Sequence, residues 1–135
     1  FEVVIVNDGS TEPKTLEALE KLEQGFPSLD LRVYSQANQG LPGARNRGVR
    51  EAQGQWVMML DADDKLASEH LRKALTLASN DDLDFVTTDI QNFGEQNFIS
   101  RVKINFYEEL FANRLLGCSF FKKGVYKNGC NFFDF

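Results

Sequence analysis

The segment Phe1-Glu-Val-Val-Ile-Val-Asn-Asp-Gly-Ser10 decides the predicted fold class. Its first six residues form an apolar, β-branched run of strand length, and the four that follow favour turns. A second junction of the same kind is Trp56-Val-Met-Met-Leu-Asp-Ala-Asp-Asp64, where an acidic turn follows another apolar run. Both runs are apolar throughout instead of alternating, which is typical of strands in a sheet that is covered on both faces.

Helical patterns alternate with strand patterns along the rest of the chain. Thr11 can cap a helix in which Pro13 suits the first turn, and Leu16, Leu19, Leu22 and Phe26 mark one face. Further helices are predicted over residues 44–53, 68–78 and 106–116, strands over 31–34, 55–60, 84–93 and 118–122, and loops over 36–43 and 94–105. This alternation predicts a doubly wound α/β domain with a mostly parallel sheet and helices on both faces. Such sheets bind ligands at the carboxyl ends of their strands, so we expect Asp8 and Asp61 at one edge.

Composition excludes several classes of protein. A chain of 135 residues with 42% hydrophobic and 26% charged residues is ordinary for one globular domain. The net charge of −5 argues against a nucleic-acid partner, and no apolar run approaches the roughly 18 residues of a membrane span. Cys118 and Cys130 lack metal-ligand spacing with His70, and two cysteines are too few for a disulfide scaffold, so a reducing cytoplasm is the default location. Because the chain opens on Phe1 without a methionine and stops at Phe135, we expect it to be a piece of a larger protein.

The acidic turn after the third predicted strand is a candidate metal site. Asp61, Asp63 and Asp64 would repel one another unless a cation or a set of donors neutralised them. Oxygen ligands suit Mg²⁺ or Mn²⁺, which commonly bridge to phosphate groups of a substrate. The alternative is that these carboxylates are solvated and that Asp64 shapes the turn or caps the next helix.

The first junction and the loop over residues 36–43 are candidate parts of a ligand site. Asp8 can accept from the N–H edge of a nucleobase, and Gly9 leaves room for a flat ring. The alternative is a simple turn in which Asp8 or Ser10 caps the following helix. Backbone N–H groups at the start of the helix predicted over 44–53 can hold an anion, and Arg45 is the arginine nearest to them.

The order of these motifs resembles that of the family 2 glycosyltransferases. The motifs are Val3-Val-Ile-Val-Asn-Asp-Gly-Ser10, Asn38-Gln-Gly-Leu41, Ala44-Arg-Asn46, Ala52-Gln-Gly54 and Leu60-Asp-Ala-Asp-Asp64. The resemblance implies a GT-A (Rossmann-like) fold and transfer of a sugar, with inversion, from a nucleotide-sugar donor such as a UDP-sugar to a glycan or lipid-linked acceptor. It implies that Asp8, with Gly9 and Ser10, binds the uracil, that Arg45 lies near the nucleotide, and that Asp61 and Asp63 form an Asp-x-Asp motif. In that motif Asp61 lies near the ribose, and Asp63 binds the Mn²⁺ or Mg²⁺ that bridges the diphosphate.

The same resemblance sets expectations for the domain and its surroundings. Residues 1–93 correspond to the donor-binding half of a single partial GT-A domain, and residues 94–135 to the start of the acceptor-side region. A first strand would precede Phe1, and the Glu-Asp motif that supplies the general base would follow Phe135, so this piece alone is expected to lack the base. The resemblance also implies a bacterial type of enzyme that makes cell-envelope polysaccharide in the cytoplasm, at the inner face of the plasma membrane.

Two alternatives from other classes remain open at this stage. An apolar strand followed by Asp-x-Asp is also typical of phosphatases of the haloacid dehalogenase type, with Asp61 as nucleophile and Asp63 as acid and base. The second alternative is a nucleotide-sugar binding module or an inactive remnant, because the motif of the general base is absent from these 135 residues. Phosphate release without a sugar nucleotide would favour the first alternative, and donor binding without transfer would favour the second.

Overall fold

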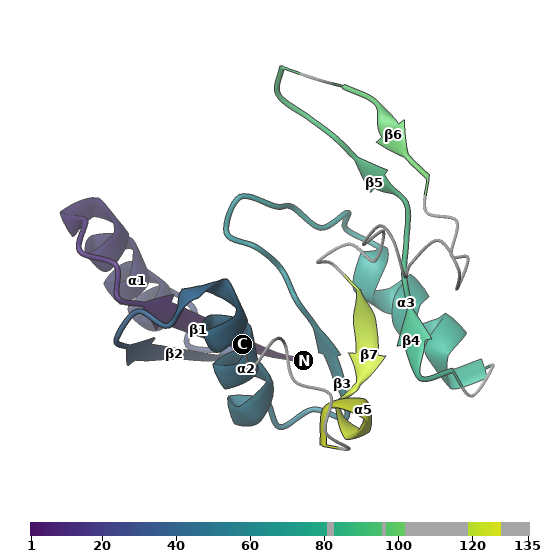
Figure 1. Cartoon of the computed structure of the whole chain (residues 1–135), viewed down its shortest axis with the longest axis horizontal. Coiled ribbons are helices and arrows are strands. Elements are labelled where there is room, and N and C mark those ends of the chain that lie inside the picture. Colours follow the sequence, from purple (N-terminus) through teal and green to yellow (C-terminus); the bar gives the residue numbers. More distant parts are fainter. Residues whose placement is uncertain (81–82, 96, 102–118, 128–135) are drawn as a thin grey trace. The chain divides into compact units, whose positions relative to one another are not determined.

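The computed structural model describes residues 1–80, 83–95, 97–101 and 119–127 (Figure 1). The chain divides into two compact units, each of which is described by itself. The first unit holds residues 1–57 and 123–135, and the second holds residues 58–122. The helix predicted over 106–116 lies outside the described residues.

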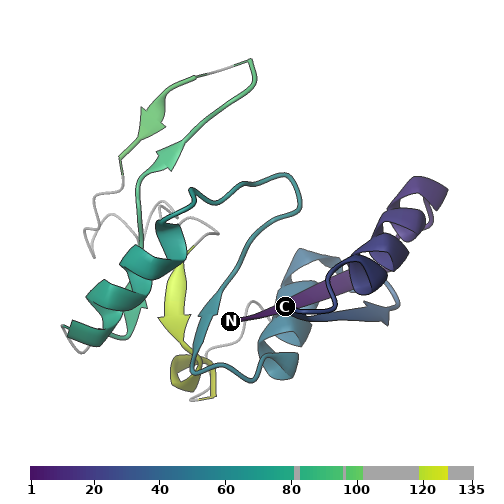
Figure 2. The ribbon, with the colours of Figure 1, turned by 180° about the vertical axis from the view of Figure 1, so that it is seen from behind.

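The first unit is built on a parallel pair of strands. β1 (Glu2–Asp8) pairs with β2 (Asp30–Gln36) in a register that runs from Glu2↔Asp30 to Asp8↔Gln36. α1 (Pro13–Gly25) connects the two strands, and α2 (Gly40–Glu51) lies along β1 in both views (Figures 1 and 2). The predicted first strand therefore ends two residues too early, because pairing with β2 continues to Asp8.

The helices of the first unit differ from the prediction at their ends. α1 has Pro13 in its first turn as predicted, but its N-cap is Glu12, not Thr11, and no side chain caps it. Its predicted apolar face is not buried: Leu16 and Phe26 are 40% and 52% exposed. α2 begins at Gly40, four residues before the predicted start, and Val49 on its inner face is fully buried. α2 packs against β1 at Gly48, where an added Cβ would lie 3.8 Å from Val6, an ordinary van der Waals contact.

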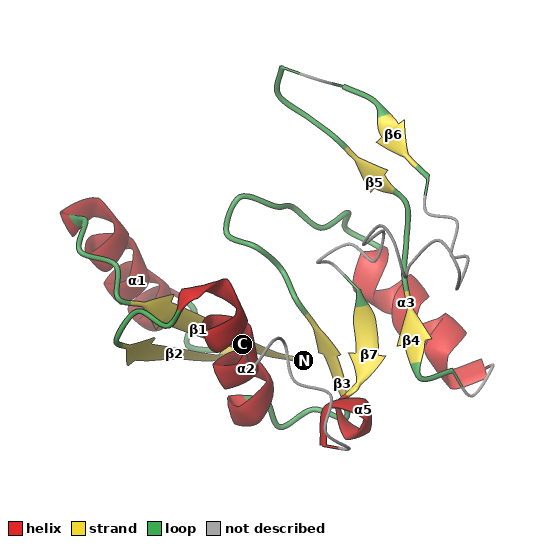
Figure 3. Ribbon diagram, viewed as in Figure 1, coloured by secondary structure: helices red, strands yellow, loops and turns green. Residues whose placement is uncertain are grey.

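In its described residues, the second unit contains one long helix and several short strands (Figure 3). Its elements are β3 (Trp56–Met58), whose last residue opens the unit, α3 (His70–Asn80), β4 (Phe85–Val86), β5 (Ile90–Gln91), β6 (Ile99–Ser100) and β7 (Phe120–Lys122). β4 and β7 pair antiparallel in a sheet of strand order β3-β7-β4, and β5 and β6 form an antiparallel pair of their own. Buried side chains from α3, β4 and β7 form the core: Ala74, Ala78, Val86, Phe120 and Phe121.

Two predictions for this unit were wrong. The single strand predicted over residues 84–93 is two strands, β4 and β5, separated by residues 87–89. The segment predicted as a loop over residues 94–105 contains β6, whose Ile99 pairs with Gln91. A two-residue strand carries almost no periodicity, so the sequence pattern could not separate it from a loop.

The overall class is α/β, but the predicted sheet is only partly reproduced. β1 and β2 are parallel as expected, whereas the pairs β4–β7 and β5–β6 are antiparallel. β3 belongs to a different sheet from β1 and β2, so one parallel sheet of three is not what the structure shows. Apolar composition indicates that a strand is buried, but it does not encode the direction of its neighbour. Among the described helices, none is long and apolar enough to cross a membrane.

Candidate functional site

Asp8 occupies the carboxyl end of β1 and is held there by two donors. The side-chain amide of Gln36 donates to Oδ1 at 2.8 Å, and the backbone N–H of Gln39 donates to the same oxygen at 2.9 Å. Gln36 is in place because it is the register partner of Asp8 at the end of β2. The carboxylate is thus fixed in direction by the neighbouring strand and by the loop that follows it.

These donors also set the charge of Asp8. They lower its pKa below the ordinary value of 3.8, with the Gln36 side chain as the largest cause and the N–H groups of Gln39 and Gly40 contributing. Burial acts in the opposite direction and is outweighed. Hydrogen bonds to the ionised form favour that form, so Asp8 is an acceptor-only carboxylate at neutral pH.

Gly9 has a conformation and a setting that other residues tolerate poorly. Its φ is +80°, and a Cβ there would lie 3.0 Å from the backbone nitrogen of Asn38. The loop after β2 therefore lies directly against the backbone that follows Asp8. A side chain at position 9 would separate this loop from the carboxylate that it helps to hold.

The turn at this junction is organised by Asn7, a residue for which no separate role was predicted from the sequence. Asn7 is buried, and its side-chain oxygen accepts from the backbone N–H of Ser10 at 2.9 Å. Its side-chain nitrogen donates to the Ser35 hydroxyl at 3.4 Å. The alternative in which Asp8 or Ser10 caps the next helix is not what the structure shows, because that N-cap is Glu12. Asn in a strand-to-helix turn is a known signal for such side-chain to backbone bonds.

Arg45 lies in the second turn of α2, within the same unit as Asp8. It is half-buried, and its neighbour Asn46 is buried, so this part of the helix faces protein instead of solvent. Arg47 is half-buried: it lies over the Tyr34 ring at 5.4 Å and pairs with Glu51 at 2.7 Å. Of the three arginines on α2, only Arg50 is exposed.

The acidic turn belongs to the second unit. The N–H of Asp64 donates to the carbonyl of Asp61 at 3.0 Å, which closes a tight turn, and Asp63 stands exposed within it. Within the described ranges, no three His, Cys, Asp or Glu side chains gather as a ready metal site. One or two carboxylates fit Mg²⁺ or Mn²⁺ nevertheless, because such ions take their other ligands from water and substrate phosphates. Asp61 and Asp63 thus have the chemistry and exposure for that role, whereas Asp8, Gly9, Ser10 and Arg45 are placed in the first unit.

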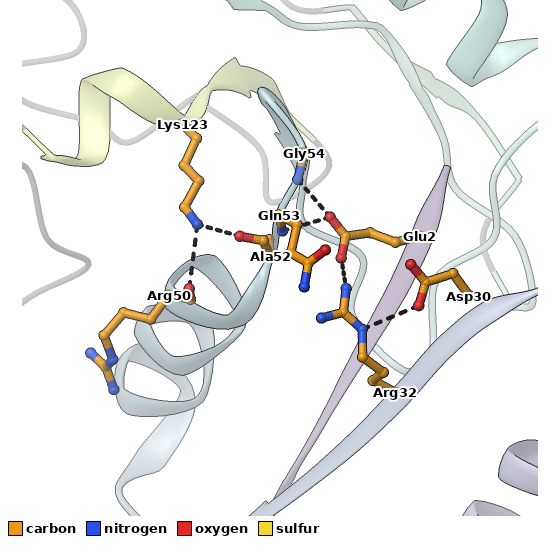
Figure 4. Close-up of polar contacts among 8 residues, drawn as sticks. All are labelled: Glu2, Asp30, Arg32, Arg50, Ala52, Gln53, Gly54 and Lys123. Carbon is orange, nitrogen blue, oxygen red and sulfur yellow. Dashed lines mark hydrogen bonds and ion pairs between the residues drawn. The ribbon is translucent and has the colours of Figure 1, made fainter.

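Figure 4 shows a further polar cluster, centred on Glu2, that was not predicted from the sequence. Oε1 of Glu2 accepts from the backbone N–H groups of Gln53 and Gly54 at 2.6 Å each, and Oε2 accepts from Arg32. Glu2 therefore ties the start of β1 to β2 and to the segment that follows α2. The available signal was a glutamate inside an otherwise apolar strand, which is tolerated only when the carboxylate is paired.

Lys123, from α5 (Lys123–Lys127), completes the end of α2 (Figure 4). Its ammonium donates to the carbonyls of Arg50, at 3.3 Å, and Ala52. These carbonyls belong to the last turn of a helix and its cap, where a cation satisfies free acceptors and the helix dipole.

The family comparison adds the decisive observation. Residues 1–133 match the model of the family described as glycosyl transferase family 2. The chain belongs to this family. The match includes every candidate residue at the end of β1, on α2 and in the acidic turn. Family 2 membership also confirms the resemblance that the ordered motifs indicated, and it implies a GT-A α/β fold.

Curated relatives support the same assignment. The chain is 39% identical to the uncharacterised glycosyltransferase YibD of Escherichia coli over 84 residues, which are 62% of this chain and 24% of YibD. It is 34% identical to cholesterol galactosyltransferase of Borreliella burgdorferi over 85 residues, 63% of this chain and 23% of that protein. It is 29% identical to glycosyltransferase GlyA of Streptococcus pneumoniae over 130 residues, 95% of this chain and 16% of GlyA. The chain thus spans about a quarter or less of the length of each of these three relatives.

Proposed function

We propose that the protein transfers a sugar from a UDP-sugar to a glycan or lipid-linked acceptor, with inversion and with the help of Mn²⁺ or Mg²⁺. The observation that carries this proposal is the ionised carboxylate of Asp8, fixed at the end of a parallel strand pair beside Gly9. The family match covers the acidic turn as well as this junction, which favours sugar transfer over the phosphatase alternative.

Asp8 is suited to recognise the base of the donor. Gln36 and Gln39 both donate to Oδ1 and fix the direction of the carboxylate, which we assign as the acceptor for the imide N–H of uracil. An acceptor that is ionised binds such a donor more strongly than a neutral one does. Gly9 presents backbone without a side chain next to Asp8, and the exposed Ser10 follows it within reach of the nucleoside.

Two features of the chain suit the charged part of the donor. The N-terminal turn of α2 begins at Gly40, and its N–H groups can donate to a phosphate oxygen, with Arg45 one turn further along. In the second unit, Asp61 and Asp63 would hold the metal ion, with Asp61 also near the ribose. The bound ion would neutralise the diphosphate as it leaves the sugar.

The remaining parts of the proposal concern the whole protein. Residues 1–93 would act as the donor-binding half and residues 94–135 as the start of the acceptor side, with the general base beyond Phe135. The relative named cholesterol galactosyltransferase is consistent with a lipid acceptor in this family. We propose a role in cell-envelope polysaccharide synthesis in the cytoplasm, at the inner face of the plasma membrane. Nothing in the composition suits a nucleic-acid partner.

Calorimetric titration with UDP tests the proposal. Asp8→Asn should weaken UDP binding by about 1–3 kcal/mol, the usual cost of losing a charge-assisted hydrogen bond. Asp30→Asn is the matched control, because Asp30 lies at the other end of the same strand pair and is 59% exposed. Equal UDP affinity in both variants would refute the role of Asp8.

A turnover assay separates an enzyme from a binding module. The complete protein, given UDP-sugar, metal ion and acceptor, should release UDP and form the glycoside. Tight donor binding without release of UDP would favour the alternative of a nucleotide-sugar binding module or an inactive remnant.

A further inference from the structure

Gln36 and Asp8 form the last register pair of β2 and β1, and a hydrogen bond joins their side chains. The pair before it, Ser35 and Asn7, is joined by a side-chain hydrogen bond of its own at 3.4 Å. Because successive side chains of a strand point to opposite faces, these two bonds lie on opposite faces of the strand pair. The parallel register therefore directs Gln36 at the carboxylate, separately from the turn that Asn7 organises.

The contact with Gln36 constrains both the charge and the direction of the Asp8 carboxylate. An ionised carboxylate can only accept, so the NH₂ group of Gln36, and not its carbonyl, faces Oδ1 at 2.8 Å. The backbone N–H of Gln39 donates to the same oxygen at 2.9 Å. The carboxylate cannot turn about its last bond without breaking one of these hydrogen bonds. A proton on that oxygen would face two N–H groups, so the neutral form is disfavoured as well.

Uncharged groups hold Asp8 in this state. Among the described residues, the groups that lower its pKa are the amide of Gln36, as the largest cause, and the N–H groups of Gln39 and Gly40. None of them titrates, so the acceptor is the same throughout the neutral pH range. The charged groups of the adjoining elements β2 and α2 are Asp30, Arg32, Arg45, Arg47, Arg50 and Glu51.

The ring nitrogen that faces such an acceptor distinguishes uracil from cytosine. N3 of uracil carries a hydrogen and donates, whereas N3 of cytosine has a lone pair and accepts. An ionised carboxylate attracts the first and repels the second. Cytosine can still donate from its exocyclic amine, but the carboxylate must turn to reach it.

We propose that Gln36 is a positioning residue through which Asp8 selects uracil over cytosine, because it fixes the direction in which the carboxylate accepts. This inference rests on the proposed function, in which Asp8 binds the base of the donor. It adds a residue that does not touch the nucleotide and acts through its hydrogen bond to Asp8.

Calorimetric titration of the complete protein with UDP and with CDP tests this role. Gln36→Leu keeps a side chain of similar size and removes the donor, so the carboxylate can turn. UDP affinity should fall about fivefold to tenfold, the usual cost of one hydrogen bond, while CDP affinity stays the same or rises. The preference for UDP over CDP should shrink by the same factor or more. Gln24→Leu is the matched control, because Gln24 is an exposed glutamine on α1 in the same unit.

Gln36→Glu adds a pH profile that a loss of structure would not produce. Two carboxyl groups this close retain one shared proton to a higher pH than either would alone. At about pH 5 the introduced carboxyl group is protonated and donates to Oδ1 as the amide does, so UDP affinity should approach the wild-type value. At about pH 8 both groups are ionised and repel each other, so UDP affinity should be about fivefold to tenfold weaker. The wild type and Gln24→Glu, measured at the same pH values, correct for protonation of UDP itself.

The outcomes separate this inference from the proposed function. If Asp8→Asn weakens UDP binding but Gln36→Leu keeps the wild-type ratio of UDP to CDP affinity, the inference is overturned and the role of Asp8 stands. A pH profile of Gln36→Glu that matches that of Gln24→Glu also overturns it. This second comparison holds even where Gln36→Leu is destabilised, because Gln36→Glu is compared with itself at two pH values. If Asp8→Asn binds UDP as tightly as the wild type does, the proposed function and the inference fail together.

Discussion

Removing the carboxylate of Glu2 should destabilise the first unit far more than removing an ordinary surface carboxylate. Glu2 and Arg32 have side chains that are only 16% and 26% exposed, and Glu2 also accepts from two backbone N–H groups. Loss of one partner of a buried ion pair costs about 3–5 kcal/mol, because the other charge remains buried. Arg32 keeps a second partner in Asp30 at 3.2 Å and a quarter of its surface in water, so we expect about 2–4 kcal/mol for Glu2→Ala.

The variant Glu2→Gln separates the loss of the contact with Arg32 from the loss of the hydrogen bonds to the backbone. In Glu2→Gln the side-chain oxygen can still accept from Gln53 and Gly54, but its NH₂ group would face the guanidinium of Arg32. We therefore expect a loss of about 1–2 kcal/mol, mainly from the charge-assisted bond to Arg32. Glu17→Ala is the control, because the Glu17–Lys21 pair is 63% and 73% exposed and such pairs contribute about 0.3–0.5 kcal/mol.

Urea denaturation measures all three variants on one scale. Trp56 is the single tryptophan of the chain and lies two residues after Gly54, so its fluorescence reports on the segment that Glu2 holds. The expected order of stability is wild type and Glu17→Ala together, then Glu2→Gln, then Glu2→Ala. If Glu2→Ala and Glu17→Ala differ by less than about 0.5 kcal/mol, the cluster around Glu2 does not stabilise the fold and the reasoning is wrong.

The remaining predictions concern the candidate site. Because the pKa of Asp8 lies below 3.8, its contribution to stability is present above that value and is lost as the pH falls through the lowered pKa. UDP affinity measured by calorimetry should therefore show no Asp8-dependent change between about pH 5 and pH 8. A change of UDP affinity with pH in that range that disappears in Asp8→Asn would contradict the lowered pKa. Gly9→Ala should cost about 1–3 kcal/mol in urea denaturation, whereas Gly25→Ala, with no atom within 4 Å of its added Cβ, should cost nothing. Asp63→Ala should abolish metal-dependent transfer by the complete protein and leave its melting temperature unchanged, while Asp64→Ala should retain most of the activity. Transfer that survives both EDTA and Asp63→Ala would rule out the metal role.

The sequence predicted the elements that carry strong patterns and missed those that depend on pairing. The first two strands, α1 and the position of Pro13 were recognised because apolar runs and proline restrict the backbone locally. The early start of α2 at Gly40 was missed, since a run containing Gly40, Pro42 and Gly43 is typical of a loop. Its helical form depends on contacts with β1 that no local pattern contains.

In the candidate site too, residues with a local sequence signal were predicted, and residues that depend on strand pairing were not. Asp8 and Gly9 were selected from the sequence because a carboxylate and a glycine follow an apolar strand, and their role in a ligand site stays a prediction. The residues that orient Asp8 could not, since Gln36 reaches it only through the parallel register of two strands and Gln39 through the loop that follows.

The contacts of Lys123 determine when the first unit can finish folding during synthesis. The last turn of α2 receives its ammonium from a residue that follows the whole second unit in sequence. A ribosome adding about 5–20 residues per second needs about 3–13 seconds to synthesise residues 58–122. During that interval the nascent β1–β2 pair and α2 can form, but the carbonyls of Arg50 and Ala52 must rely on water. The first unit to emerge from the ribosome is therefore the last to be completed. Chaperones that act during translation would meet it before Lys123 can donate to the carbonyls at the end of α2.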